Sequence, residues 1–565
     1  MRKIVFALVG VGGLICAFSL AHAARKSGAA AAVSAHLPPA AVSALQKIDP
    51  EHIRAHVRFL SHDLLEGRGT GQRGGDIAAE YIATEFWLNG LKAAGDNGTF
   101  FQQVSFVGIT PTPETTFELA PNKGDSQKLK PLEDYVAYDQ TQHNSDDIDA
   151  QIVYVGYGIE APEYQWDDYK GTDVHGKVLL MLVNEPTSND PNFFKGPALT
   201  YYGRWTYKYE EAARQGAVGA ILIHKSEMAS YPWGVVRNSN SGEKSFLKSD
   251  SSQLKAASWI QLDVARKLAQ NAGMDLKKMM DDAQLRDFHP VALPVKLKAH
   301  MASKIRPFSS RNVVAMLEGS DAKLKSEAVV YSAHYDHLGI RPDMSGDNIY
   351  NGARDNATGC GIVLELARVF AQGQARPRRS VIFSAVTAEE QGLLGSEYMG
   401  KHPPIAAGKI ALDLNFDDIP PLGAPEEVEV SGAERTNFYP TVEGMAREFH
   451  LAIRPDSHPE AGHYYRSDHF SFGRVGVPAF SINEGMNYKG HNTEWGMQQA
   501  EAYTNKQYHQ PSDEYSPSMD FTGNAAMARF GFALGWAAAS QPKLVEWQKG
   551  DEFEKARMQS RGAGH

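Results

Sequence analysis

The fold of this chain is decided by residues 329–390, which read VVYSAHYDHLGIRPDMSGDNIYNGARDNATGCGIVLELARVFAQGQARPRRSVIFSAVTAEE. Two short apolar runs, Val329–Ala333 and Ser380–Val386, have the length and composition of strands that are buried on both faces. Between them, Cys360–Phe370 places its apolar residues at helical spacing. Alternation of strand and helix predicts a mostly parallel sheet with helices on both faces.

Polar side chains follow these strands at the points where the strands end. His334 and Asp336 come directly after the first strand, Glu389 and Glu390 follow the second, and Asp355 leads into the helix. In open α/β sheets the site lies beyond the carboxyl ends of the strands, so we expect these side chains to lie close together. A mixture of imidazole and carboxylate ligands is one that zinc favours. The sequence therefore predicts a metal site at this edge.

The same α/β pattern continues to about Ala539. A region with a different residue pattern precedes it in the chain. From about residue 132 to 295, short β-rich runs are broken by Asn, Asp, Pro and Gly, and no Asp/Glu/His cluster has ligand spacing. A chain of 565 residues is also too long for one hydrophobic core. We therefore expect an α/β domain with a mostly parallel or mixed sheet, plus an inserted β-rich domain without chemistry of its own.

The first residues have the pattern of an export signal. Arg2 and Lys3 precede the apolar run Ile4–Leu20, and Ala21-His22-Ala23 resembles a cleavage site. We favour a cleaved signal peptide over a retained membrane anchor, and hence a periplasmic or secreted bacterial protein. Cys16 would leave with the signal, so Cys360 would be alone, without an intrachain disulfide, as a buried packing residue.

Charge and glycine patterns exclude some binding functions. The formal net charge is −10, and no Lys/Arg-rich run offsets it, so we expect no nucleic-acid partner. Residues 66–75 form a glycine-rich loop before a helical segment, but they match neither phosphate-binding fingerprint. We expect this loop to need close backbone approach to a neighbour instead.

Beyond these patterns, the chain resembles a known family, the M28 zinc exopeptidases, whose larger members carry an inserted protease-associated (PA) domain. The resemblance of the catalytic part rests on His334–His337, Asn351–Gly359, Thr387–Ser396, Leu414–Asp417 and Tyr508–Asp513. Leu60–Gly71 is similar to the family's N-terminal region. Four further segments resemble the PA insert: Val155–Ile159, Asp167–Lys170, Gly176–Val178 and Arg214–Ala220.

This resemblance implies a domain organisation. Residues 1–23 would be the signal peptide and 24–44 a flexible leader. The zinc peptidase catalytic domain would span 45–131 and 296–545, interrupted by a PA-like domain at 132–295. Residues 546–565 would be a charged surface tail.

The resemblance also implies a ligand set for two zinc ions. Asp355 would bridge the ions, His334 and Asp417 would complete one site, and Glu390 and His509 would complete the other. A water bridging the two metals would be the nucleophile.

The resemblance also implies catalytic or supporting roles for three residues that are not metal ligands. Glu389 would be the general base, Asp336 would accept the second ring N–H of the zinc-binding imidazole, and Tyr464 would donate to the carbonyl oxyanion. His337 and His469 lie in the same motifs, and we interpret them as loop or packing residues.

The function that this resemblance favours is removal of amino-terminal residues from peptides. A carboxypeptidase of the same fold stays open, because Arg354 and Arg466 are conceivable anchors for a substrate carboxylate. A glutaminyl cyclase, which shares the fold but uses a single zinc, is a second alternative. A binding protein that has lost its metal is a third, although the ligands and the base are all present here. The sequence does not indicate an oligomeric state.

Overall fold

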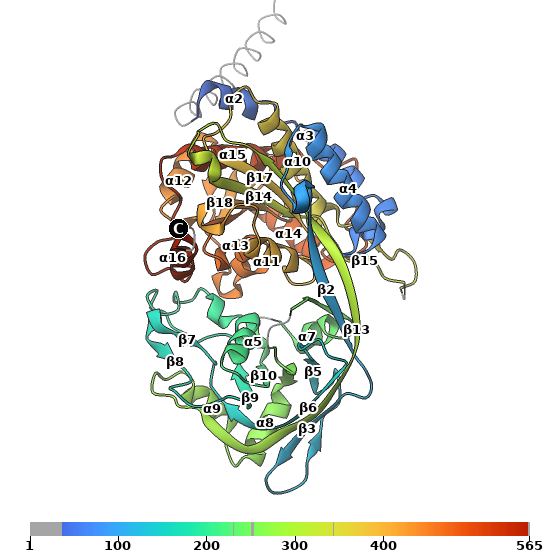
Figure 1. The fold of residues 1–565 in the computed structure, drawn as a ribbon, viewed down its shortest axis with the longest axis vertical. Helices are drawn as coiled ribbons and strands as arrows, with labels where there is room; N and C mark the ends of the chain where they lie inside the picture. Colours follow the sequence, from blue (N-terminus) through green and yellow to red (C-terminus); the bar gives the residue numbers. More distant parts are fainter. Residues whose placement is uncertain (1–36, 230, 250–252, 343, 563–565) are drawn as a thin grey trace, which may run out of the picture. The chain divides into compact units, whose positions relative to one another are not determined.

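The computed structural model describes residues 37–229, 231–249, 253–342 and 344–562, which form two compact units (Figure 1). The first unit contains the described residues up to Gln103 together with Arg311–Pro455 and the residues from Ser467 onward. The second unit contains Val104–Ser310 and Asp456–Arg466. The predicted signal peptide lies outside the described residues.

The first unit is built on a sheet with four parallel strands at its centre. These are β17 (Ser380–Val386), β14 (Ala328–His334), β18 (Ile410–Phe416) and β21 (Ala479–Glu484), hydrogen-bonded in that order. The end of β13 (Val291–Leu317) pairs antiparallel with β17, and β19 (Glu427–Ser431) pairs antiparallel with β21. Every residue of β14, β17 and β18 is buried. This arrangement confirms the predicted α/β class.

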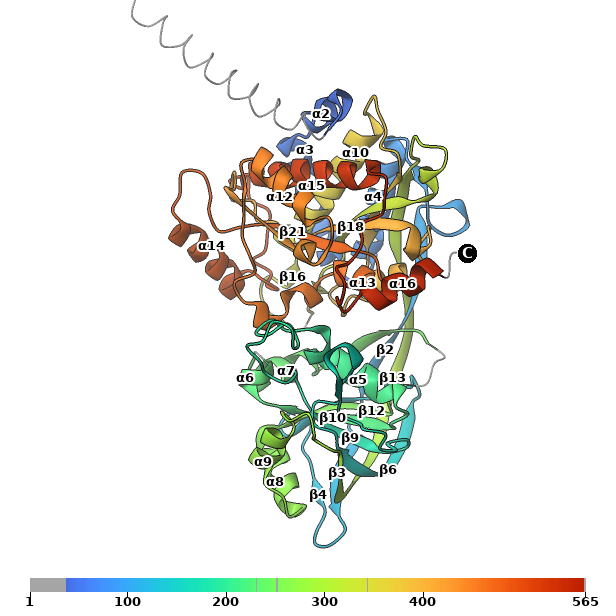
Figure 2. The same ribbon diagram turned by 90° about the vertical axis from the view of Figure 1, so that its left-hand side faces the viewer.

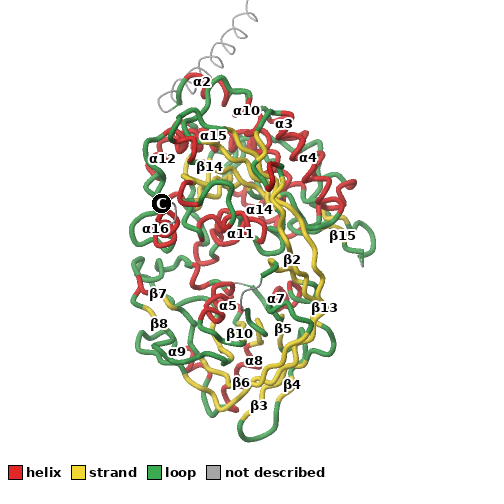
Figure 3. The backbone as a smooth tube through the Cα atoms, in the orientation of Figure 1, coloured by secondary structure: helices red, strands yellow, loops and turns green. Residues whose placement is uncertain are grey.

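Helices cover both faces of this sheet (Figure 3). Along β14, Val329 and Tyr331 face a large core, and Val330 faces a smaller one, as the alternation of a strand requires. Six of the described α-helices contribute residues to the large core: α2 (Pro39–Leu45), α3 (Pro50–Leu60), α4 (Arg73–Leu88), α10 (Thr358–Ala371), α12 (Tyr439–Glu448) and α15 (Thr522–Ser540). The smaller core is covered by α11 (Leu394–Lys401) and α13 (His469–Arg474).

Helix α15 approaches the sheet through two glycines, and Figure 2 shows it running beside α12 (Tyr439–Glu448) over β18 and β21. A Cβ atom on Gly535 would lie 2.0 Å from the hydroxyl of Tyr331. One on Gly531 would lie 2.5 Å from the ring of Phe416. The Tyr331 hydroxyl donates to the main-chain oxygen of Gly531 at 3.0 Å. These glycines therefore set the distance between α15 and the sheet.

The second unit contains its own sheet, in the order β6-β9-β10-β12-β5. Its members are β5 (Tyr135–Tyr138), β6 (Ser145–Tyr154), β9 (Val178–Leu182), β10 (Gly219–His224) and β12 (Ala256–Gln261), with β5 antiparallel to β12 and the other neighbours parallel. Helices α5 (Trp205–Arg214), α8 (Leu262–Asn271) and α9 (Leu276–Asp282) pack on it. Strands β2 (Phe101–Pro111) and β13 carry the chain from one unit into the other.

The unit boundaries differ from those expected from the sequence. The sequence predicts an insert at 132–295, whereas the main segment of the second unit spans 104–310. The unit is larger because the first part of β13 pairs with both β3 (Thr116–Pro121) and β6. Residues 456–466 also belong to the second unit, where the main chain of Leu199 donates to Pro459 at 3.0 Å. Identification of this unit as a PA-like domain stays a prediction.

Both predicted chain ends need correction. The predicted flexible leader, 24–44, ends inside helix α2 (Pro39–Leu45), in which Ala41 and Ala44 are buried in the large core. The predicted charged tail contains α16 (Glu554–Gly562), in which Arg557 is buried and donates to the main-chain oxygens of Ile410 and Val545. A buried guanidinium that satisfies several carbonyls ties this helix to the start of β18.

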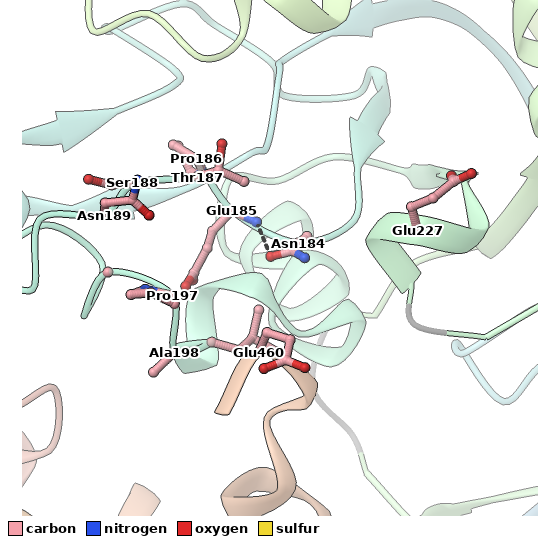
Figure 4. Close-up of a pocket in the computed structure, with 12 residues that line it drawn as sticks. Asn184, Glu185, Pro186, Thr187, Ser188, Asn189, Pro197, Ala198, Glu227 and Glu460 are labelled. Carbon is pink, nitrogen blue, oxygen red and sulfur yellow. Dashed lines mark hydrogen bonds between the residues drawn. The ribbon is translucent and has the colours of Figure 1, made fainter. Parts of the chain in front are cut away.

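The second unit contains a cavity of about 510 Å³, shown in Figure 4. Its wall includes the loop 184–189 and two exposed carboxylates, Glu227 and Glu460. A third carboxylate, Glu185, is buried and accepts from the main chain of Thr200 at 2.8 Å. Because Glu460 lies in residues 456–466, this segment completes the cavity wall. Within the described residues, no helix has both the length and the apolar character needed to cross a bilayer.

The packing of α15 gives a testable prediction. We expect Gly535→Ala to destabilise the first unit by about 1–3 kcal/mol, since the new methyl group would overlap the Tyr331 hydroxyl. Urea denaturation followed by far-UV circular dichroism measures the change. The matched control is Gly444→Ala in α12, where the nearest atom is the flexible end of Arg447 at 4.0 Å. We expect that control to be stabilised by about 0.5–1 kcal/mol. Equal effects of the two substitutions would contradict this account of the packing.

Candidate metal centre

The candidate site lies at the carboxyl ends of the parallel strands of the first unit. His334 is the last residue of β14, and Asp417 follows β18 directly. Glu389 and Glu390 follow β17, and Asp355 lies in a short distorted turn, Ala353–Ala357, before α10. His509 is contributed by the loop after α14 (Thr493–Lys506). Parallel strands bring these distant residues to one edge.

Asp355 lies at the centre of the site. Its Oδ1 is 3.4 Å from Nε2 of His334, and its Oδ2 is 3.2 Å from Nε2 of His509. Asp417 approaches His334 Nε2 at 3.1 Å, and Glu390 approaches His509 Nε2 at 3.2 Å. The five predicted ligands thus form two imidazole–carboxylate pairs that share one aspartate. This is the arrangement expected for two cations on a bridging carboxylate.

His337 is part of the site, which contradicts its interpretation as a loop or packing residue. The side chain is fully buried, and its Nδ1 lies 2.6 Å from Oε1 of Glu390. Ligand atoms of His337, Asp355 and Glu390 lie within 4.8 Å of one another, as do those of His334, Asp355 and Asp417. The sequence offered one indication of this role, because His337 directly follows the His-x-Asp motif of His334 and Asp336. His469 is also buried, but among the described residues neither His469 nor the predicted ligand His509 belongs to either of these two groups. His509 contacts Asp355 and Glu390 through Nε2 instead.

The electrostatics of the site fit bound cations. Burial alone would raise the pKa of Asp355, but His337, His334 and His509 lower it to well below its usual range. Burial would likewise lower the imidazole pKa values. Instead, Glu390 and Asp355 raise the pKa of His509 to about 11, and Asp417 and Glu389 raise that of His334 well above its usual range. Protons on these imidazoles compensate clustered carboxylates, and divalent zinc would replace them with the same donor atoms.

Glu389 adjoins this cluster without being part of either ligand group. One of its carboxylate oxygens is 4.0 Å from His334 Nε2. Burial, reinforced by Asp417 and Glu390, raises the pKa of Glu389 well above its usual range, although His334 opposes the shift. A carboxylate with a raised pKa binds a proton more tightly than an ordinary one, which suits it to accept a proton as a general base.

Asp336 acts differently from the prediction. The Nδ1 atom of His334 is 3.2 Å from the main-chain oxygen of Asp336, whereas the Asp336 carboxylate is 3.8 Å away. That carboxylate instead accepts from the Thr70 hydroxyl at 2.9 Å and from the main-chain N–H of Glu389 at 3.2 Å. Asp336 therefore fixes the backbone that carries Glu389, and Thr70 is a contributor that the sequence did not indicate.

Arg68 is a second residue that sequence reasoning missed. Its buried guanidinium donates to the main-chain oxygens of Leu60, Tyr335, Asn351 and Gly352, at 2.5–3.0 Å. The carbonyls of Asn351 and Gly352 lie shortly before Asp355, and that of Tyr335 lies between His334 and Asp336. The Arg68 side chain therefore connects the segment that carries His334 with the segment that carries Asp355.

The glycines around Arg68 show why its loop is glycine-rich. A Cβ atom on Gly67, which has φ 66°, would lie 2.6 Å from the main-chain oxygen of Gly339. A Cβ atom on Gly74 would lie 1.7 Å from the main-chain oxygen of Leu65. The predicted close backbone approach of this loop is confirmed.

Two more residues hold ligand loops in place. The carboxylate of Asp513, the last residue of the Tyr508–Asp513 motif, accepts from the main-chain N–H groups of Arg354 and Asp355 at 3.0–3.2 Å. The Ser467 hydroxyl donates to Oδ2 of Asp417 at 2.6 Å. Neither was predicted, because both contacts join segments far apart in the sequence.

The remaining sequence candidates are placed as follows. Arg354 is paired with Asp418 at 2.7 Å and stacks over the ring of Tyr503 at 3.8 Å. Arg466 lies in the second unit, where it donates to the main-chain oxygen of Ala461. Tyr464 is buried and also belongs to the second unit, so its role stays a prediction. Cys360 is buried and unpaired by disulfide, as expected, and its thiol donates to the main-chain oxygen of His334.

Part of this chain is similar in sequence to known proteins. Residues 312–531 match the profile of Peptidase family M28. A "Probable zinc metalloprotease" of Pyricularia oryzae is 38% identical over 120 residues, which are 21% of this chain and 23% of that protein. "Leupeptin-inactivating enzyme 1" of Streptomyces exfoliatus is 28% identical over 214 residues, or 37% and 46% of the two chains. The matched region thus spans less than half of either relative.

Among solved structures, an aminopeptidase from Aneurinibacillus sp. strain AM-1 is similar with a TM-score of 0.49 and 20% identity. That similarity covers 88% of this chain and 96% of the other. A zinc aminopeptidase from Bacillus subtilis is similar with a TM-score of 0.40 and 16% identity, over 88% and 97% of the two chains.

The raised imidazole pKa values predict coupled proton release. Asp417 and Glu389 raise the pKa of His334, and Glu390 and Asp355 raise that of His509 to about 11, so both imidazoles hold their protons more tightly than usual in the metal-free chain. Zinc binds only the neutral rings. Zinc binding should therefore release about two protons per chain and tighten as the pH rises from 6 to 8. Titration calorimetry in buffers of different ionisation enthalpy measures the number. Binding that is insensitive to buffer and pH would contradict the assignment of these imidazoles as ligands.

Proposed function

Because residues 312–531 form a domain of peptidase family M28, we propose that this chain is a dizinc exopeptidase that removes residues from the amino end of peptides. The observation that carries the proposal is the position of Asp355, whose two carboxylate oxygens face two different imidazoles. Each imidazole is accompanied by a further carboxylate, Asp417 or Glu390.

The ligands divide into two sets. His334, Asp355 and Asp417 would hold one ion, and Asp355, Glu390 and His509 the other. The second imidazole beside Glu390, His337, would orient that carboxylate by donating to Oε1, which leaves Oε2 directed toward His509. When bound, zinc acidifies a water molecule and polarises the peptide carbonyl.

Glu389 supplies the proton transfer in this proposal. It would accept the proton of the attacking water and return it to the leaving amine, for which its raised pKa suits it. The hydrogen bond from its main-chain N–H to Asp336 fixes its backbone, so the carboxylate is held beside the ligands without joining them.

The charges of the site favour the amino end of a peptide over the carboxyl end. The carboxylates of Asp355, Glu390 and Asp417 would be neutralised by the cations that they hold. Glu389, 4.0 Å from His334 Nε2, would then be the acidic group beside them that can face a substrate ammonium group. Arg354, the cation nearest the bridging aspartate in sequence, is already neutralised by Asp418 and covered by Tyr503, so it is not available to a substrate carboxylate. A complete His334–Asp417 pair favours two metals over the single zinc of a glutaminyl cyclase. A binding protein would have no need for Glu389.

Localisation and partners belong to the same proposal. Export to the periplasm or beyond is supported by the basic, apolar and small-residue pattern of residues 2–23. Peptides would be the partners, and the acidic net charge makes nucleic acid an unsuitable one.

The general base gives the sharpest test. Glu389→Gln removes the proton acceptor while keeping the shape of the side chain, so kcat on aminoacyl substrates should fall by about 100-fold or more. Zinc content, measured by metal analysis, should be unchanged. The matched control is Glu397→Gln on α11, a half-buried residue that pairs with Lys401 one turn further along the same helix and that should retain full activity. Unchanged hydrolysis by Glu389→Gln would remove Glu389 from the mechanism.

The direction of cleavage is tested with matched substrates. We expect turnover of aminoacyl amides and dipeptides with a free amino group, and loss of turnover by about 100-fold or more when that amine is acetylated, because an acetylated amine carries no charge and cannot pair with Glu389. Turnover of N-blocked dipeptides with a free carboxylate would instead indicate a carboxypeptidase. One zinc per chain with cyclisation of amino-terminal glutamine would indicate the cyclase.

A further inference from the structure

The two central imidazoles of the site are supported in different ways. His334 is buried, with 1% of its side chain exposed, and its Nδ1 is hydrogen-bonded to the main chain of Asp336. Its plane is therefore fixed by a polar contact inside the protein, as is usual for a metal-binding histidine.

His509 lacks this kind of support. Its side chain is 36% exposed, and only Nε2 contacts the carboxylates of Asp355 and Glu390. Among the described residues, we find no hydrogen-bond partner for Nδ1. A solvent-exposed imidazole with free rotation would lose conformational entropy each time it binds a metal.

An aromatic ring takes the place of the missing partner. The ring of Tyr508 lies parallel to that of His509, with centroids 3.9 Å apart and an interplanar angle of 23°. Tyr508 is itself fixed by its main-chain N–H, which donates to the oxygen of Tyr503 at 2.9 Å, and by its ring contact with Tyr503 at 6.1 Å. Tyr503 is buried and covered by Arg354. The stack is thus attached to the interior of the first unit.

We propose that Tyr508 is the positioning residue for His509, and that face-to-face stacking fixes the imidazole plane at the metal site formed with Asp355 and Glu390. This inference rests on the proposed dizinc function. Coordination to a cation makes an imidazole electron-poor, and an electron-rich phenol ring stabilises such a partner across its face. The stack therefore strengthens when the metal is bound and supports one of the two sites selectively.

Substitution of Tyr508 separates stacking from the phenol hydroxyl. Tyr508→Phe keeps the ring, so zinc affinity at both sites should stay within about threefold of the unsubstituted chain. Tyr508→Leu removes the aromatic face, so affinity at the His509 site should fall by about 10–100-fold while the His334 site is unchanged. Competition with a chromophoric chelator measures both affinities. The visible spectrum of the cobalt-substituted chain reports the geometry of the weakened site.

A second stacked pair provides the matched control. His491 and Trp495 stack with centroids 3.8 Å apart and an angle of 16°, but His491 is not one of the ligands proposed above. Trp495→Leu should leave both zinc affinities unchanged. Since Tyr508 is 43% exposed, we expect its variants to fold, and circular dichroism checks this.

The outcomes distinguish this inference from the proposed function. If the unsubstituted chain binds fewer than two zinc ions or hydrolyses no peptide, the proposed function fails. If it does both, and Tyr508→Leu binds zinc as tightly at both sites, only the positioning role is overturned. A raised KM of Tyr508→Leu at saturating zinc, with unchanged zinc affinities, would also overturn it and would make Tyr508 a substrate contact. Loss of affinity in Tyr508→Leu with retention in Tyr508→Phe supports it.

Discussion

The site depends on one constraint: a single carboxylate, that of Asp355, has to face two imidazoles at once. The geometry is imposed on the backbone, because Asp513 accepts from the N–H groups of Arg354 and Asp355 and so fixes the turn from behind. Arg68 holds the preceding carbonyls of Asn351 and Gly352. The turn that carries Asp355 is therefore held by hydrogen bonds from the guanidinium of Arg68 on its N-terminal side and to the carboxylate of Asp513. Since both are buried, their contacts act in a medium of low dielectric constant, where each is stronger than at the surface.

The sheet and the residues at its carboxyl edge could be predicted because their signals are local. Val329–Ala333 and Ser380–Val386 are continuous apolar runs, and the structure makes them fully buried parallel neighbours. His334 and Glu390 follow such runs, and Asp355 precedes the helix between them, so locating these elements located the three side chains. The resemblance to a family added Asp417 and His509. Their grouping then follows from the parallel order of the strands.

The supporting residues could not be predicted because their partners are distant in the chain. Arg68 binds the main-chain oxygen of Tyr335 across 267 positions, and Asp513 binds Asp355 across 158. Every residue has a main-chain carbonyl group. The residue types at 335–352 therefore do not indicate which of these carbonyls accept hydrogen bonds from an arginine. His337 was misinterpreted for a different reason: its motif offered several polar side chains, and only packing decides which of them turns toward Glu390. The boundaries of the second unit were misplaced because β13 is one strand that serves both units.

The path of the chain through residues 455–467 has a consequence for how such a protein can be altered or can diverge. The polypeptide leaves the first unit after Pro455, contributes Glu460 to the cavity of the second, and returns at Ser467, whose hydroxyl binds Asp417. The second unit is therefore formed by two separate segments of the chain, 104–310 and 456–466, and is not a single continuous insertion. Excision of residues 104–310 alone would leave residues 456–466 without the rest of their unit, immediately before Ser467, whose hydroxyl binds a predicted ligand. Removal or exchange of the second unit would therefore have to include both segments of the chain.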